Sequence, residues 1–163
     1  MDTRTTHDGA VVVVGVDGSD GSKAALRFAL DEARRRSATL RVVTVWEFPA
    51  TIAMGMVLPP DFDDVSAQAA EHSAQAAIDE LGEAGVPVEL KVLDGNPAGA
   101  LIAQARDADV LVVGSRGRGG FRELLLGSVS QACVHHAGCP VVVIRHHPAP
   151  QATAKTGVGA ASA

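Results

Sequence analysis

Five short runs of β-branched and other apolar residues recur along the chain, and each suits a buried strand. The runs cover residues 11–16, 40–45, 86–93, 109–115 and 140–145. Several are continuously apolar instead of alternating with polar residues, which is typical of strands that are covered on both faces in a parallel sheet. The pattern therefore predicts a sheet that lies between two layers of helices.

Four stretches with helical spacing of their apolar residues separate these strands. The first has an N-cap candidate in Ser19 or Asp20 and an arginine-rich last turn, which suits the helix dipole. The third places Pro97 at a first helical position, where a missing N–H does little harm. The predicted helices cover residues 19–36, 63–85, 96–107 and 127–136.

Strands and helices alternate along the whole chain in this prediction. With right-handed crossovers, such an order gives a three-layer, doubly wound α/β domain around a five-stranded parallel sheet, for which we expect the strand order 3-2-1-4-5. A chain of 163 residues with 47% hydrophobic content is long enough for one core, so we expect a single domain over residues 1–147. Residues 148–163 are small, polar and nearly uncharged, and we interpret them as a disordered tail.

Residues 46–64 form the one long connection between predicted elements. A connection of this length is either a packed surface loop or a flap over a ligand, and the sequence leaves both interpretations open.

Charge and composition narrow the possible functions. A formal net charge of −5 argues against nucleic-acid binding through a broad basic surface. The N-terminal residues carry acids and no apolar signal region, and no apolar run approaches the roughly 20 residues that cross a bilayer, so we expect a cytoplasmic protein without a membrane partner. Cys133 and Cys139 are interpreted as small buried side chains, because a zinc site that combines them with nearby histidines fits no finger spacing.

Glycines crowd into one stretch, VVGSRGRGGFRELLLGSV at residues 112–129. In the expected strand order, the first and fourth strands end side by side where the crossovers diverge, which is where open α/β sheets bind ligands. A phosphate at this point needs backbone N–H groups at close range and gains from a helix N-terminus, so the missing side chains predict an anion site. Alternatively, the glycines only form a tight loop, with Ser128 as an ordinary helix cap.

The glycine spacing fits neither common phosphate-binding fingerprint, because the chain has no Gly-Lys-Ser/Thr and no G-x-G-x-x-G after its first strand. It reads G-x2-G-x9-G-S from Gly114 to Ser128. Together with VGVDGSDGSKAAL, VVTVWE, GNPAGALIAQARDADVLVVGSRG and LLLGSVSQACVHHAGCPVVVIR, this spacing resembles the ATP-binding branch of the universal stress protein family over about residues 10–146. The resemblance implies a Rossmann-like fold, similar to that of the adenine nucleotide alpha hydrolases.

The same resemblance implies a set of ligand-binding residues. It assigns Gly114 to the ribose side of an adenine nucleotide and the backbone of Val45 to the adenine. Asp17 matches an acid that approaches the ribose or a bound Mg²⁺. The implied phosphate-binding residues are Gly117, Gly127, Ser128 and Val129.

Asp17 and the arginines of the glycine-rich loop each allow a second interpretation. Asp17 also suits an Asx-turn with Ser19, the commoner role of an Asp in Asp-Gly-Ser, and both roles are compatible. Arg116, Arg118 and Arg122 are either a solvated face or a source of one phosphate contact, and we count Arg116 among the binding residues.

Three classes of function remain: a nucleotide-binding regulatory protein, an enzyme of similar fold, and an interaction module with an empty site. Fast phosphoryl transfer uses a cationic clamp, metal-holding carboxylates and a residue that orients the nucleophile, and the sequence offers only Asp17 and the loop arginines. We therefore expect a stress-response protein that binds ATP, with Mg²⁺, and has no catalytic residues and at most weak hydrolysis. A slow ATPase and a cyclic-nucleotide-binding module are the alternatives.

The fifth strand is expected to join two copies of the chain. Its residues Val141, Val142, Val143 and Ile144 form a flat apolar run at the edge of the sheet, with no inward charge to guard it. A two-fold axis allows identical antiparallel strands to satisfy each other's backbone groups. The family resemblance also implies a homodimer through this strand.

Overall fold

The protein is built around a five-stranded parallel sheet in the order β3-β2-β1-β4-β5, as the sequence predicts. We describe it from a computed structural model, which covers residues 9–117 and 125–146. The strands are β1 (Val11–Gly15), β2 (Thr39–Trp46), β3 (Val88–Asp94), β4 (Val110–Gly114) and β5 (Val141–Ile144). The expected tail, residues 148–163, lies outside these residues.

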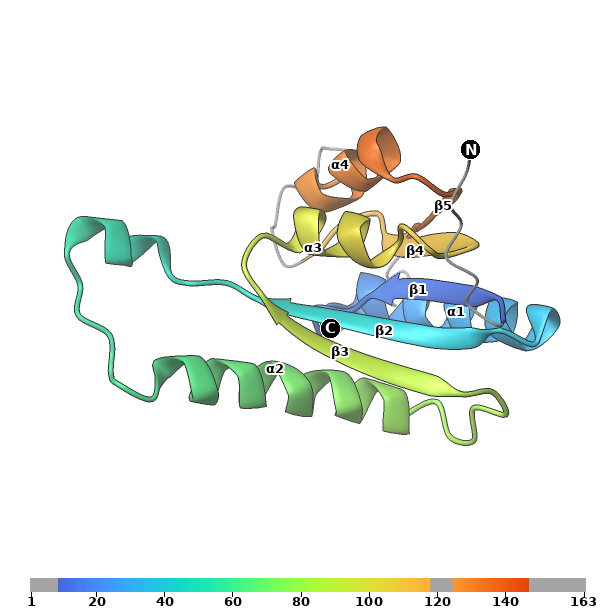
Figure 1. The fold of residues 1–163 in the computed structure, drawn as a ribbon, viewed down its shortest axis with the longest axis horizontal. Coiled ribbons are helices and arrows are strands. Elements are labelled where there is room, and N and C mark those ends of the chain that lie inside the picture. Colours follow the sequence, from blue (N-terminus) through green and yellow to red (C-terminus); the bar gives the residue numbers. More distant parts are fainter. Residues whose placement is uncertain (1–8, 118–124, 147–163) are drawn as a thin grey trace, which may run out of the picture.

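Helices cover both faces of the sheet and make it the middle of three layers (Figure 1). They are α1 (Asp20–Arg36), the 3-10 helix η1 (Ala50–Met54), α2 (Phe62–Asp79), α3 (Pro97–Gln104) and α4 (Ser128–His136). On one face, α1 packs against β1 and β4, and α2 packs against β2 and β3. The helices α3 and α4 contact each other on the opposite face.

The helix boundaries follow from local capping chemistry. Ser19 caps α1 by accepting a hydrogen bond from the N–H of Ser22 at 3.2 Å, and Asn96 caps α3 in the same way for Gly99 at 2.9 Å. Pro97 occupies the first helical position of α3, as expected.

The second helix ends earlier than the sequence predicts, at Asp79 instead of Gly85. The N–H groups of Leu81 and Gly82 bond to the carbonyls three residues before them, which tightens the chain out of α-helical geometry. Gly82 then adopts a left-handed conformation with φ of 71°, which a glycine adopts without strain. Gly85 has a similar φ of 69°, so the segment between them is a glycine-made turn and not a helix.

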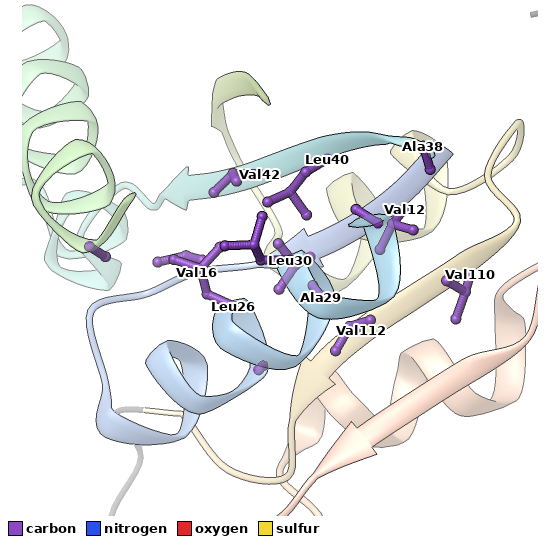
Figure 2. Close-up of a cluster of buried hydrophobic side chains, with 14 residues drawn as sticks. Val12, Val16, Leu26, Ala29, Leu30, Ala38, Leu40, Val42, Val110 and Val112 are labelled. Carbon is purple, nitrogen blue, oxygen red and sulfur yellow. The ribbon is translucent and has the colours of Figure 1, made fainter. Parts of the chain in front are cut away.

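Two apolar clusters hold the three layers together, one on each face of the sheet. In the larger cluster, side chains of α1 such as Leu26, Ala29 and Leu30 meet Val12 of β1 and Val112 of β4 (Figure 2). The second cluster packs α3 and α4 against the other face. None of the helices in the described residues is long and apolar enough to cross a membrane.

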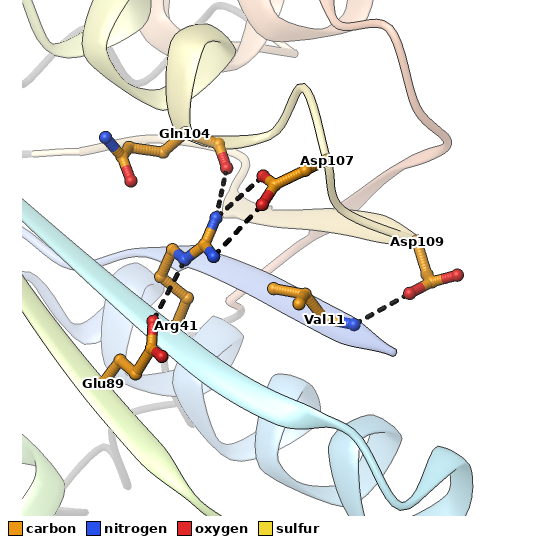
Figure 3. Close-up of polar contacts among 6 residues, drawn as sticks. All are labelled: Val11, Arg41, Glu89, Gln104, Asp107 and Asp109. Atoms are coloured by element: carbon orange, nitrogen blue, oxygen red, sulfur yellow. Dashed lines mark hydrogen bonds and ion pairs between the residues drawn. The ribbon is translucent and has the colours of Figure 1, made fainter. Parts of the chain in front are cut away.

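One charged side chain is buried within this second face. Arg41, in the middle of β2, is 8% exposed and donates hydrogen bonds to the backbone carbonyl of Gln104 at 3.0 Å and to the carboxylate of Asp107 at 2.9 Å (Figure 3). Glu89 on β3 forms a longer ion pair with it, at 3.4 Å. The hydrogen bonds to Asp107 hold the pKa of Arg41 above its usual value, so the guanidinium remains charged and ties β2 to the end of α3.

Candidate nucleotide-binding site

The ends of β1 and β4 meet at the carboxyl edge of the sheet, where the candidate residues were expected. The two strands pair in parallel, with Val14 opposite Val112. Because α1 follows β1 on one face and α4 follows β4 on the other, the chain leaves the two strands in opposite directions (Figure 1). This is the switch point at which open α/β sheets leave room for a ligand.

Asp17 and Gly117 bring the two loops into contact. A Cβ built at Gly117 would lie 2.5 Å from Oδ2 of Asp17. The carboxylate therefore occupies the space next to the glycine, and any larger residue at position 117 would displace it. The sequence places these residues 100 positions apart, so their contact is a product of the strand order.

The second carboxylate oxygen of Asp17 holds the start of α1. Oδ1 accepts hydrogen bonds from the N–H of Ser19 at 3.0 Å and from its hydroxyl at 2.5 Å. This is the Asx-turn that the sequence suggests, and Ser19 in turn caps the helix. Asp17 is thus fixed by the turn while its other oxygen faces the glycine loop.

Gly114 has a packing reason for lacking a side chain. A Cβ at this position would lie 2.9 Å from the carbonyl carbon of Gly21 and 3.2 Å from the N of Ser22, both backbone atoms of α1. Gly21 lacks a side chain for the same packing reason. A Cβ built at Gly21 would lie 2.9 Å from the carbonyl oxygen of Arg116. The first turn of α1 therefore rests directly on the backbone that leaves β4.

The start of α4 is tied to the same loop. The carbonyl of Ser115 accepts hydrogen bonds from the N–H of Gly127 at 2.7 Å and from the hydroxyl of Ser130 at 3.0 Å. Gly127 is the N-cap residue, with extended φ and ψ of −76° and 168°, and a Cβ there would meet its neighbours only at ordinary distances of 3.6 Å or more. In contrast to Gly114, no contact with residues 9–117 and 125–146 requires a glycine at position 127.

The first turn of α4 offers backbone donors at this point. The first hydrogen bond within the helix joins the N–H of Gln131 to the carbonyl of Gly127 at 2.9 Å, so the N–H groups of Ser128, Val129 and Ser130 precede the helical ladder. Ser128 is exposed, and Val129 is half-buried against the second core cluster. A helix N-terminus with these donors favours an anion.

Val45 lies one strand away, near the end of β2. The carbonyl of Val43 accepts from Val16 of the β1 side, and the carbonyl of Trp46 accepts from Gly95 of the β3 side. The backbone N–H and C=O groups of successive residues point to opposite sides of a strand, so those of Val45 point to the same side as those of Val43, toward β1. Because β1 pairs with β2 only as far as Gly15, opposite Val43, the Val45 groups lie beyond the end of that pairing. Its backbone thus faces the same corner of the sheet as Asp17.

Of the two cysteines, Cys133 is buried, as the sequence predicts, whereas Cys139 is only partly buried. Cys133 is a residue of α4 that packs into the second apolar cluster, and this burial raises the pKa of its thiol to about 11. Burial also raises the pKa of Cys139, which is partly exposed. No group of three or more metal-ligating side chains occurs in residues 9–117 and 125–146.

The structure therefore brings together the candidate residues Asp17, Gly114, Arg116, Gly117 and Gly127, with the first turn of α4 and the backbone of Val45 beside them. Arg118 and Arg122 lie outside the described residues. Sequence reasoning missed Gly21, Ser115 and Ser130, which fix the geometry of the loops without facing a ligand. A glycine in the first turn of a helix, where it lowers helix propensity, was the available signal for Gly21.

The long connection after β2 extends away from the sheet instead of lying over this site (Figure 1). At its base, the rings of Trp46 and Phe48 contact each other edge-on with centroids 4.9 Å apart, and Phe62 lies 6.1 Å from Phe48. The connection is therefore anchored at its base and exposed beyond it.

Comparisons with known proteins agree on one family. The model of the universal stress protein family matches residues 10–145. A universal stress protein of Mycobacterium tuberculosis is 40% identical over 138 residues, which are 83% of this chain and 45% of that protein, so the chain spans about half the length of that relative. A universal stress protein of Thermus aquaticus is 35% identical over 82% of this chain and 97% of its own length.

Solved structures of the same family superpose on this chain. A universal stress protein of Archaeoglobus fulgidus in complex with dAMP has a TM-score of 0.56 at 28% identity, covering 83% of this chain and 97% of that one. An Arabidopsis thaliana family member with AMP bound has a TM-score of 0.58 at 26% identity, covering 86% and 97%. A universal stress protein in complex with cAMP has a TM-score of 0.57 at 28% identity, covering 85% and 98%. The chain belongs to the universal stress protein family.

Proposed function

We propose that this protein binds ATP together with Mg²⁺ at the carboxyl edge of β1 and β4, and that the bound nucleotide regulates it during stress. The observation that carries the proposal is the convergence of the Asp17 carboxylate, Gly117 and the N-terminus of α4 at one corner of the sheet. Structures of family members in complex with AMP, dAMP or cAMP support an adenine nucleotide as the class of ligand.

Each group has a role in this proposal. The N–H groups of Ser128 and Val129 at the start of α4 bind phosphate oxygens, and the absence of a Cβ at Gly127 allows them to come close. Arg116 adds a positive charge on the same loop. The backbone of Val45 contacts the adenine, and Gly114 lies on the ribose side.

Asp17 needs a different explanation, since a carboxylate repels phosphates. Mg²⁺ is usually held by one or two carboxylates together with substrate phosphates and water, and the one carboxylate oxygen of Asp17 that faces Gly117 fits that donor set. When bound, the ion would neutralise the phosphate charge beside this carboxylate. The ribose hydroxyl groups are the second ligand that suits Asp17.

The groups named above bind and orient a nucleotide, whereas fast phosphoryl transfer also uses a residue that orients the attacking nucleophile. We therefore assign no catalytic residue and propose at most slow hydrolysis. A slow ATPase and a cyclic-nucleotide-binding module remain the competing functions, and the ligand preference separates them.

Titration calorimetry tests the proposal directly. The purified protein is titrated with ATP, AMP, cAMP and GTP, each with Mg²⁺ and again with a chelator. We expect ATP to bind more tightly with Mg²⁺, and GTP to bind more weakly than ATP. If no adenine nucleotide binds at about 1 mM, a binding free energy weaker than about −4 kcal/mol, the proposal is wrong. A preference for cAMP over ATP would favour the cyclic-nucleotide-binding module.

The second part of the proposal is a homodimer through β5. This strand forms one edge of the sheet, and all four of its residues are only half-buried, on both faces. The carbonyls of Pro140 and Ile144 accept hydrogen bonds from β4, so by alternation the N–H of Val142 points inward and that of Val143 points outward. Val143→Pro removes an outward donor and leaves the ladder to β4 intact.

Sedimentation equilibrium measures this interface. We expect the Val143→Pro variant to dimerise at least tenfold more weakly than the wild type, while its circular dichroism spectrum is unchanged. Equal dimerisation of both proteins rejects pairing through β5.

A further inference from the structure

An apolar arm leaves the carboxyl edge of the sheet beside the proposed nucleotide site. It comprises residues 47–61, between β2 and α2, so it begins two residues after Val45, and it projects away from the three layers (Figure 1). Met54 and Val57, near its tip, are almost fully exposed, at 86% and 91%. Ile52 and Met56 are exposed as well. Apolar surface gathered in this way marks a place where another group binds.

The tip of the arm is folded, but little holds it in place. The N–H of Ile52 bonds to the carbonyl of Pro49 at 3.0 Å, and the N–H of Gly55 bonds to that of Ile52 at 3.0 Å, which forms the turn of η1. No side chain of η1 is buried. Among the described residues, the backbone of the arm forms hydrogen bonds only within itself and with the first turn of α2. Segments with so few buried contacts move at a low cost in free energy, and the lids of binding sites are drawn from them.

The arm is long enough to fold back over the end of β1. The rings of Trp46, Phe48 and Phe62 contact one another at its base, so a hinge has to lie beyond them. Residues 56–59, which belong to no helix or strand, and the residues next to Pro49 are the places for it. The tip begins four residues after Trp46, and four extended residues span up to about 14 Å, whereas neighbouring strands lie only about 4.8 Å apart. The tip therefore reaches the neighbouring strand end without any change in the sheet.

The chemistry of the arm suits the base of a nucleotide and not its phosphates. No charged residue occurs from Phe48 to Pro60, and the acids Glu47 and Asp61 stay at the two ends of this segment. In the proposed function, the adenine lies on the β2 side, at the backbone of Val45, and the phosphates lie on the β4 side, at the start of α4. Because the arm begins on the β2 side, its tip meets the base first and keeps its acids away from the phosphates.

We propose that the arm is a lid, which closes over the adenine of a bound nucleotide and places Met54 and Met56 against its ring. Closure of this kind rests on the proposed function, because it requires an adenine nucleotide beside Val45. Thioether sulfur makes favourable contacts with aromatic rings, and the flexible methionine side chain adapts to the shape that it covers. These contacts form only in the closed position, so the bound nucleotide shifts the arm from open to closed. Closure slows the release of the nucleotide and hides an apolar surface that the open arm exposes.

Methyl NMR tests the closure, because the chain has only 3 methionines, Met1, Met54 and Met56. Calorimetry first measures the affinity for ATP with Mg²⁺, and the protein with ¹³C-labelled methionine methyl groups is then titrated with the same ligand. We expect the methyl signals of Met54 and Met56 to shift through the ring current of the adenine and to give nuclear Overhauser effects to its ring protons. The signal of Met1 is the internal reference and stays unchanged.

The other outcomes of this titration separate the lid from the proposed function. ATP binding without any change in the Met54 and Met56 signals overturns the lid and leaves nucleotide binding intact. No ATP binding in calorimetry overturns the proposed function, and the lid with it. If the two signals change with protein concentration and not with ATP, the arm packs against a second copy of the chain, and the lid is wrong.

Calorimetry of variants provides a second test. The Met54→Gln/Met56→Gln double variant keeps the length and the neutrality of both side chains but removes their sulfur atoms and makes them polar. We expect it to bind ATP and AMP each about fivefold or more weakly than the wild type, and by the same factor, because the arm covers the base that the two ligands share. Val134→Gln, at an exposed apolar position on α4, is the matched control and leaves both affinities unchanged. Wild-type affinities in the double variant, or a loss for ATP without a loss for AMP, would overturn the lid.

Discussion

Replacing Gly114 with alanine tests whether the glycine loop is shaped by packing as well as by a ligand. The added Cβ would lie 2.9 Å from the carbonyl carbon of Gly21 and 3.0 Å from its carbonyl oxygen. Both atoms belong to the backbone of α1, so the helix has to retreat by roughly half an ångström, and overpacking of this kind costs about 1–3 kcal/mol of stability. For a domain of this size, the melting temperature then falls by roughly 2–12 °C.

Two other glycines provide matched controls for the same substitution. A Cβ at Gly99 in α3 meets only the Asn96 side chain at 3.6 Å, and alanine there should stabilise the protein by about 0.5–1 kcal/mol through helix propensity. A Cβ at Gly138 meets no atom of the described residues within 4 Å, so Gly138→Ala should change stability by less than about 0.5 kcal/mol.

Urea denaturation of the three variants without nucleotide measures these differences. The order of stability expected is Gly99→Ala, then Gly138→Ala and wild type together, then Gly114→Ala. If Gly114→Ala is as stable as the wild type within about 0.5 kcal/mol, α1 does not rest on the β4 backbone as described, and the packing argument fails.

Three further outcomes are expected. Asp107→Ala should lower the free energy of unfolding by about 2–4 kcal/mol, because it leaves the buried Arg41 guanidinium without its main partner. Arg41→Met should lower it by less, and equal losses in urea denaturation would contradict this account. Cys133 should react slowly with a thiol reagent at pH 8, and rapid labelling of the folded protein would show that the thiol is not buried. The contribution of the Cys133 thiol to stability is present below the ordinary thiol pKa of 9.0 and should be lost as the pH rises to about 11. ATP turnover should stay below about one per second, and faster turnover that is lost in Asp17→Ala would make the protein an enzyme.

The arrangement of layers and strands was predictable because it depends on patterns that the sequence displays openly. Continuously apolar runs indicate strands that are buried on both faces, and Ser19 and Pro97 mark helix starts by local chemistry. The end of α2 was not predictable in the same way, because Gly82 and Gly85 both suit a helix end and the sequence pattern does not choose between them.

The contacts that shape the site depend on tertiary structure. Nothing local tells that the backbone at Gly114 meets Gly21, or that the Gly117 loop meets the Asp17 carboxylate. The apolar run at residues 40–45 contains one charged residue, Arg41. A charged residue in such a run indicates a buried partner, which the structure identifies as Asp107.

The direction of each backbone group on β5 also comes from the structure. A strand presents alternate N–H groups to its two sides, and only the register with β4 shows which set faces outward. The sequence identifies the edge strand, but only the structure shows that Val143, and not Val142, is the position at which a proline removes an outward N–H.

The most direct test of nucleotide binding at the α4 N-terminus compares Gly127→Asp with Gly127→Asn. Both side chains suit the extended N-cap geometry, with φ of −76° and ψ of 168°, so both variants should be at least as stable as the wild type. They have nearly the same shape and differ by one negative charge. At 4–5 Å, that charge repels a phosphate by about 3–4 kcal/mol at an effective dielectric constant of 20, before screening by salt.

Calorimetric titration with ATP and Mg²⁺ is the measurement. We expect Gly127→Asp to bind at least tenfold more weakly than Gly127→Asn, a difference of about 1.4 kcal/mol or more, while urea denaturation shows no loss of stability. Equal affinity in the wild type and both variants would mean that the phosphates do not bind at this helix, and would contradict the account.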